Sequence, residues 1–145
     1  MISKKYIITL LLMLGIFTGH AQEWMTDIEE AKKEASTLDR NIVLVFQGSD
    51  WCAPCMKLEK EIWLSEAFIT YSKENFVLLK ADFPKKRNNQ LDPVQQEKNG
   101  LLAERYNTDG YFPLVVVLNA KGEVLGKTGY EKVSPTDYIK TLSSF

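Results

Sequence analysis

The feature that most constrains this chain is a pair of cysteines three residues apart, Cys52 and Cys55, the only cysteines in 145 residues. An apolar run of β-type residues precedes the pair, and a helical pattern begins after it. The pair therefore lies at a strand-to-helix junction. Positions i and i+3 of a helical turn share one face, so the two sulfurs can form and break a disulfide reversibly.

Helix electrostatics predict different roles for the two sulfurs. Cys52 is expected at or just before the first helical position, where unpaired N–H groups and the positive helix end favour a thiolate. Cys55, one turn further in, is expected to be more enclosed. We therefore predict that Cys52 is the nucleophile and Cys55 the resolving cysteine. Pro54 is tolerated between them because the donor it removes has no intrahelical partner in the first turn.

Residues 1–21 have the pattern of a secretory signal peptide. Lys4 and Lys5 precede an apolar stretch over residues 7–17, and Gly19-His20-Ala21 is a small-x-small cleavage site. The alternative is a membrane anchor, but the stretch is much shorter than the roughly 20 apolar residues that a spanning helix needs. We predict export to the periplasm or secretion, with no stable membrane insertion after cleavage.

Composition excludes several classes of function for the mature domain, residues 22–145. The chain has 18 basic and 19 acidic residues, and Lys4 and Lys5 leave with the signal, so the mature domain is mildly acidic and no nucleic-acid partner is expected. The single histidine, His20, leaves with them. Without an imidazole, Cys-His catalysis, Ser-His-Asp catalysis and an imidazole metal site are excluded. We predict a single domain and a monomer, with no metal and no cofactor.

Hydrophobic periodicity and turn residues divide the mature chain into alternating elements. The first two strands should be parallel because a helical crossover joins them. The expected elements are a helix over 25–37 with Thr26 as a cap, a strand over 42–46, a helix after Cys55, a second helical piece capped by Ser65, a strand over 76–81, a helix over 93–106, strands over 114–118 and 123–127, and a last helix capped by Ser134.

Several side chains outside the dithiol are expected to serve the fold or solubility and not the chemistry. Val94, Leu101, Leu102 and Tyr106 form the expected buried stripe of the helix over 93–106. Glu59 and Glu61 are expected on an exposed helix face. Lys85, Lys86 and Arg87 are interpreted as a solvated loop rather than a docking patch.

This order of elements, with the dithiol after the first strand, resembles the thioredoxin fold over residues 23–145. The specific motifs are Trp51-Cys52-Ala53-Pro54-Cys55 and Phe112-Pro113 ahead of the third strand. The resemblance implies an α/β fold whose central mixed four-stranded sheet has helices on both faces. It also implies a cis bond at Pro113 and a Phe112 backbone that binds an extended substrate segment across Cys52. Trp51 is either a further substrate contact or a packing residue over the helix start.

Two positions depart from the family pattern. Thioredoxins have a buried carboxylate on the strand before the dithiol, which helps to move the proton of the resolving cysteine; Val45 and Phe46 at the matching place are apolar. Resolution is then either slower, or another carboxylate such as Asp50 serves through water. The residue before the cis proline is often small or β-branched in the family, whereas Phe112 is bulky.

We therefore predict an enzyme, an exported thiol–disulfide oxidoreductase that reduces or isomerises protein disulfides and is recharged by an envelope electron donor. Ala-Pro between the cysteines is close to the Gly-Pro of thioredoxin and lacks the histidine of the oxidising relatives. The alternatives are a redox-inert module that binds extended peptides and a metal-binding chaperone, which would need a dimer to complete its ligands. A purely structural disulfide would add only about 2 kcal/mol, because the loop it closes is short.

Overall fold

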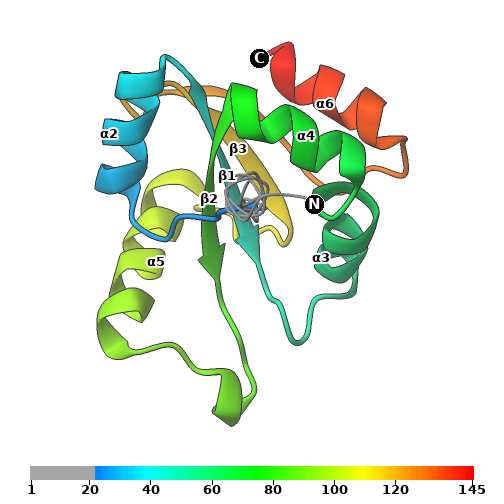
Figure 1. The fold of residues 1–145 in the computed structure, drawn as a ribbon. Coiled ribbons are helices and arrows are strands. Elements are labelled where there is room, and N and C mark those ends of the chain that lie inside the picture. Colours follow the sequence, from blue (N-terminus) through cyan, green and yellow to red (C-terminus); the bar gives the residue numbers. More distant parts are fainter. Residues whose placement is uncertain (1–21) are drawn as a thin grey trace, which may run out of the picture.

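The computed structural model describes residues 22–145, so the predicted signal peptide lies outside the described residues. The helices and strands follow one another along the chain (Figure 1) as α2 (Ile28–Leu38), β1 (Asn41–Gln47), α3 (Ala53–Leu58), the π-helix η1 (Glu59–Trp63), α4 (Glu66–Asn75), β2 (Phe76–Asp82), the 3₁₀ turn η2 (Arg87–Asn89), α5 (Pro93–Tyr106), β3 (Leu114–Leu118), β4 (Val124–Thr128) and α6 (Pro135–Ser143).

The four strands form one mixed sheet in the order β2-β1-β3-β4. β1 and β2 are parallel, whereas β3 is antiparallel to both β1 and β4. The parallel pairing of the first two strands and the mixed four-stranded sheet are confirmed. The register pairs Gln47 with Asp82 and Phe46 with Leu114. The ends of β1 and β2 and the start of β3 therefore meet at one edge of the sheet.

Helices cover both faces of the sheet, as predicted (Figure 1). Successive strand residues point to opposite faces, so Leu44 packs in the core under α2 and α5, while Val45 packs in the core under α3, α4 and α6. Every residue from Ile42 to Phe46 is fully buried. A continuous apolar strand is what a sheet covered on both faces requires.

The first helix is shorter than the sequence predicts. Asp27, not Thr26, caps α2, because its carboxylate accepts hydrogen bonds from the N–H groups of Glu29 and Glu30. Met25 is drawn into the sheet instead, where its backbone bonds to Leu78 and Lys80. Competition from the edge of β2 thus sets where α2 begins.

Two other helices differ in detail from the prediction. In α5, Leu102 and Tyr106 are buried, but Val94 and Leu101 are 63% and 58% exposed, and Asn99 takes the third inward position. The helix that begins after Cys52 widens into a π turn from Glu59, where the N–H of Leu64 bonds to the Glu59 carbonyl. The last helix begins after its predicted cap, Ser134, as expected.

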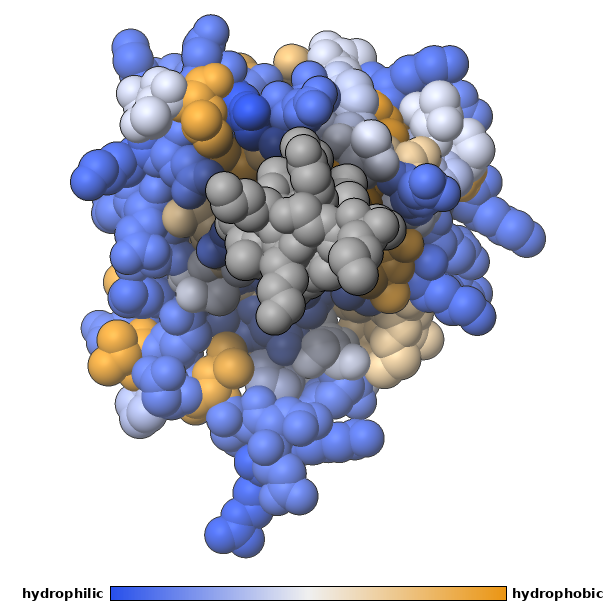
Figure 2. Space-filling model, viewed as in Figure 1, coloured by the Kyte–Doolittle hydropathy of each residue, from blue (hydrophilic) through white to orange (hydrophobic). Residues whose placement is uncertain are grey.

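The connection from β2 to α5 projects from the rest of the domain. It carries η2 and forms the extension at the lower end of Figure 1, and the same region is hydrophilic in the space-filling view (Figure 2). Within residues 22–145, no helix is both long and apolar enough to cross a membrane.

Candidate active site

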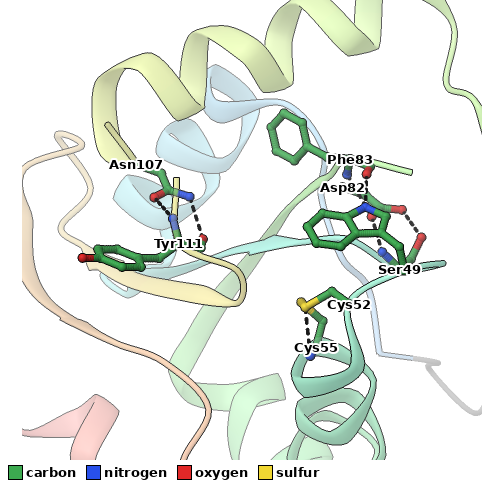
Figure 3. The surroundings of a disulfide bond; sticks show 8 residues. Ser49, Cys52, Cys55, Asp82, Phe83, Asn107 and Tyr111 are labelled. Carbon is green, nitrogen blue, oxygen red and sulfur yellow. Dashed lines mark hydrogen bonds between the residues drawn. A yellow bond between two sulfur atoms is a disulfide. The ribbon is translucent and has the colours of Figure 1, made fainter. Parts of the chain in front are cut away.

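Cys52, which immediately precedes α3, forms a disulfide with Cys55 in the first turn of α3 (Figure 3). The turn after β1 is closed by a hydrogen bond from the N–H of Cys52 to the Gly48 carbonyl at 2.9 Å. The two cysteines lie 5.2 Å apart between their Cα atoms, a separation within the usual range for a disulfide. The two cysteines that the sequence predicts to pair are therefore bonded to each other at a strand-to-helix junction.

The first turn of α3 directs a donor at the first sulfur. Cys52 is the N-cap of α3 with an extended backbone, and the N–H of Cys55 points at its Sγ over 3.3 Å. The aligned peptide dipoles of a helix place partial positive charge at the same end. Negative charge is thus favoured on the Cys52 sulfur, which is the electrostatic requirement for a reactive thiolate.

Both cysteines are enclosed to the same degree. Each has 4% of its surface exposed, so the expected difference in enclosure between Cys52 and Cys55 is not seen. The side chains that border the pair therefore decide how a partner reaches the sulfurs.

Trp51 packs over the turn before the disulfide. Its indole N–H donates to the Phe83 carbonyl at 2.7 Å, and a Cβ on Gly48 would collide with the indole ring. Trp51 and Phe83 both contact Phe112 edge to face, with ring centroids 5.4 and 5.5 Å apart. Trp51 therefore has a packing role, and the residue is still 37% exposed.

The peptide bond between Phe112 and Pro113 is cis, as the family resemblance implies. The loop before it is held by two hydrogen bonds between Asn107 and the Tyr111 backbone, each 2.9 Å long. Figure 3 shows these two residues on one side of the disulfide. Because Phe112 contacts Trp51, the structure brings the residue before the cis proline against the residue that directly precedes Cys52 in the chain.

Hydrogen bonds join the connection after β2 to Asp50, the residue before Trp51. The Asp50 carboxylate accepts hydrogen bonds from the N–H groups of Lys85 and Lys86, both at 2.9 Å, and from the Asn89 side chain at 3.0 Å. These bonds, that from Lys85 foremost, hold the pKa of Asp50 below its usual value. Asp50 therefore braces a loop, which leaves it poorly placed to replace the missing strand carboxylate.

The same connection supplies residues that the sequence reading misses. Asp82 accepts hydrogen bonds from the Ser49 N–H and hydroxyl (Figure 3), and the Lys85 amine lies 3.9 Å from the centre of the Trp51 ring. Lys85 is thus a site-bordering cation rather than a solvated residue alone. These partners are more than 30 positions apart in sequence, so only the pairing of β1 with β2 places them together.

Comparisons with known proteins point to one family. Residues 23–120 match the family model described as thioredoxin-like. The chain is 31% identical over 115 residues to the disulfide bond reductase DsbH of Chlamydia pneumoniae, covering 79% of this chain and 68% of that protein. It is 32% identical over 105 residues to the thioredoxin-related protein DsbJ of the same organism, covering 67% of this chain and 30% of that protein.

A solved structure agrees with these matches. The DsbH oxidoreductase structure superposes with a TM-score of 0.77 at 30% sequence identity, covering 84% of this chain and 82% of that one. Its likeness extends beyond the dithiol segment to nearly the whole described domain.

Proposed function

The chain belongs to the thioredoxin-like family and is a thiol–disulfide oxidoreductase, and from this premise we propose the roles of its site residues and the direction of its reaction. Cys52 attacks a disulfide of a protein substrate as the thiolate, forming a mixed disulfide and releasing one substrate thiol. Cys55 then attacks the Cys52 sulfur, which releases the second substrate thiol and leaves the Cys52–Cys55 disulfide. Two electrons pass from the enzyme to the substrate.

One observation carries the assignment of Cys52 as the nucleophile. The Cys55 nitrogen is 3.3 Å from the Cys52 sulfur at the front of α3, whereas Cys55 itself is the third residue of the helix. A donor and the positive helix end at one sulfur favour its thiolate over that of the other.

The proposed net direction is reduction or isomerisation of substrate disulfides. It is supported by the similarity to a relative named as a disulfide bond reductase and by the Ala53-Pro54 pair between the cysteines. Oxidation of the enzyme in each cycle requires an electron donor that returns it to the dithiol.

We assign substrate binding to Trp51, Phe112 and Pro113. Trp51 is partly exposed and directly precedes Cys52 in the chain, and Phe112 contacts its indole ring. An extended substrate segment would add to the Phe112 backbone in the manner of an extra strand, with its disulfide across Cys52. The bulk of Phe112 limits which side chains can flank that disulfide.

We place this reaction outside the cytoplasm. The basis is the signal-peptide pattern of residues 1–21, with residues 22–145 as the exported thioredoxin-like domain. The mature domain acts as a periplasmic or secreted monomer, and its electron donor belongs to the cell envelope.

Single-cysteine variants test these roles. We expect Cys55→Ser to accumulate a mixed disulfide with a protein such as oxidised insulin, because the resolving thiol is absent, and Cys52→Ser to form none. Rapid, selective alkylation of Cys52 in the reduced protein at pH 6 would support its role as the nucleophile. If both thiols are alkylated equally slowly and Cys55→Ser forms no mixed disulfide, the protein is instead a redox-inert binding module.

Equilibration with glutathione tests the direction. A reductase has a potential towards that of thioredoxin, about −270 mV, while strong oxidants lie near about −120 mV. A value close to the latter would reverse the proposed direction without affecting the assignment of the two cysteines.

A further inference from the structure

A cavity of about 430 Å³ opens beside Cys55, and Cys52 does not border it. Its walls come from α3, η1 and the ends of β1 and β2, and they include Glu59, Lys60, Lys80 and Asp82. Cys55 therefore borders a space that contains four charged side chains and that neither Trp51 nor Phe112 lines. The volume is large enough to hold several water molecules.

Glu59 enters this cavity from the helix that carries Cys55. Its N–H bonds to the carbonyls of Cys55 and Met56, so it lies one turn beyond Cys55 on the same helix side. The sequence predicts an exposed Glu59, but its side chain is partly buried, and its Oε2 atom is enclosed without any hydrogen-bond partner in the described residues. An enclosed carboxylate oxygen without a donor destabilises the folded state, so its presence calls for a functional explanation.

The other carboxylates near the dithiol already have donors. Asp82 accepts from the Ser49 N–H, the Ser49 hydroxyl and the Phe83 N–H. Asp50 holds the β2–α5 connection through three donors. Of the two carboxylates that border this cavity, Asp82 has donors on both oxygens, whereas Glu59 has an enclosed oxygen that accepts no hydrogen bond from residues 22–145.

Three charged side chains border the cavity together with Glu59. Lys60 comes from the same helical segment as Glu59, and Lys80 and Asp82 come from β2. Across residues 22–145, neither lysine forms an ion pair with Glu59; the Lys80 amine lies 5.0 Å from the centre of the Trp24 ring.

We propose that the Glu59 carboxylate is the proton acceptor for the Cys55 thiol. The inference rests on the proposed function, and it concerns only the second half of the exchange. Glu59 takes the proton as the Cys55 sulfur attacks Cys52 and the substrate thiolate departs; the proton then returns to solvent or to the departing thiolate. The strand positions Val45 and Phe46 are buried and apolar, so they cannot supply this base.

The test separates the two halves of the exchange in one assay. The fully reduced protein is mixed with excess 5,5′-dithiobis(2-nitrobenzoic acid) in a stopped-flow instrument. Attack by Cys52 releases one thionitrobenzoate, and attack by Cys55 releases the second, so each step has its own absorbance phase. Substituting Glu59→Gln keeps the size of the side chain and a hydrogen-bond acceptor but removes the base.

We expect Glu59→Gln to leave the first phase within twofold and to slow the second roughly a hundredfold at neutral pH, the low end of general-base effects. The difference should close above about pH 9, where a thiol ionises without assistance. Glu59→Asp should retain part of the second-phase rate. Thermal unfolding should not be lowered by Glu59→Gln, because the variant removes an enclosed charge.

The matched control is Glu61→Gln, two residues further along, where an exposed carboxylate accepts a hydrogen bond from the Tyr130 hydroxyl. It should change neither phase. Equal second phases in Glu59→Gln and the unsubstituted protein would overturn the role of Glu59, as would equal slowing of both phases. Absence of both phases in the unsubstituted protein would instead contradict the proposed function. Should Glu59→Gln unfold, Glu59→Asp and the pH profile of the unsubstituted protein still decide.

Discussion

Single buried polar residues hold loops against the core. The Tyr106 hydroxyl donates to the Gly122 carbonyl at 2.7 Å, and the Tyr138 hydroxyl donates to the Gly129 carbonyl at 2.7 Å. Burial raises the pKa of Tyr138, so its phenol stays a protonated donor over the whole neutral range. Glu59 differs from these residues because no donor within residues 22–145 reaches its enclosed oxygen, and we assign that difference to catalysis rather than to stability.

Removing one such hydroxyl tests the strength of these ties. Tyr106→Phe should lower the free energy of unfolding by about 1–3 kcal/mol, because the buried Gly122 carbonyl loses its donor. Denaturant unfolding measures this, with Tyr111→Phe as the control, since Tyr111 is 63% exposed. The free energy of unfolding of Tyr111→Phe should stay within about 0.5 kcal/mol of that of the unsubstituted protein. Equal losses in both variants would show that the Gly122 bond is not the source.

At the scale of elements, the connection from β2 to α5 is ordered by the dithiol turn. Asp50 accepts from the N–H groups of Lys85 and Lys86, and Trp51 donates to the Phe83 carbonyl. The turn before Cys52 and this connection therefore form one unit across the carboxyl ends of two parallel strands. A change in either segment should reach the side of the active site that carries Trp51.

Acid titration tests this unit. The pKa of Asp50 is lowered in the folded protein, so its carboxylate contributes stability that is fully present above the unfolded pKa and is lost as pH falls through the folded value. The amide resonances of Lys85 and Lys86 should therefore shift with a midpoint below 3.8, the ordinary value for Asp. Asp50→Asn should abolish the titration. A midpoint at or above 3.8 would contradict the bracing role.

At the scale of the whole molecule, stability comes from two apolar layers rather than from the disulfide. One layer lies between the sheet and α2 with α5, and the other lies between the sheet and the helices around Trp63. The Cys52–Cys55 bond spans only three positions of sequence, so it restricts the unfolded chain little. A redox enzyme needs this separation, because its fold has to persist in both oxidation states.

Reduction of the disulfide tests this separation. The reduced protein should stay folded, with a free energy of unfolding lower by at most about 2 kcal/mol, the chain-entropy value for so short a loop. Denaturant unfolding of the oxidised and reduced forms gives the difference. Trp63→Ala, which empties a fully buried position, should cost about 3–5 kcal/mol by comparison. Unfolding on reduction alone would refute the independence of the core.

The local pattern of the sequence accounts for most of the architecture. The apolar run over β1, the i, i+3 spacing of the cysteines and the Ser65 and Ser134 caps depend on neighbours in sequence, and these predictions are confirmed. The parallel first pair of strands, which follows from the helical crossover, is confirmed as well, and so are the fold class and the cis bond before Pro113, which the family resemblance implies. Periodicity and capping act over one or two turns, so they can be read from residue order alone.

Contacts between distant segments were decided only by the tertiary structure. Thr26 loses its expected capping role because Met25 pairs with β2, and Val94 and Leu101 are exposed because Asn99 takes an inward position on α5. The bracing of Asp50 and the enclosure of Glu59 likewise depend on how β2 and the helix after Cys52 pack together. Burial and hydrogen bonding between residues tens of positions apart are set by strand register and helix packing, which no local pattern encodes.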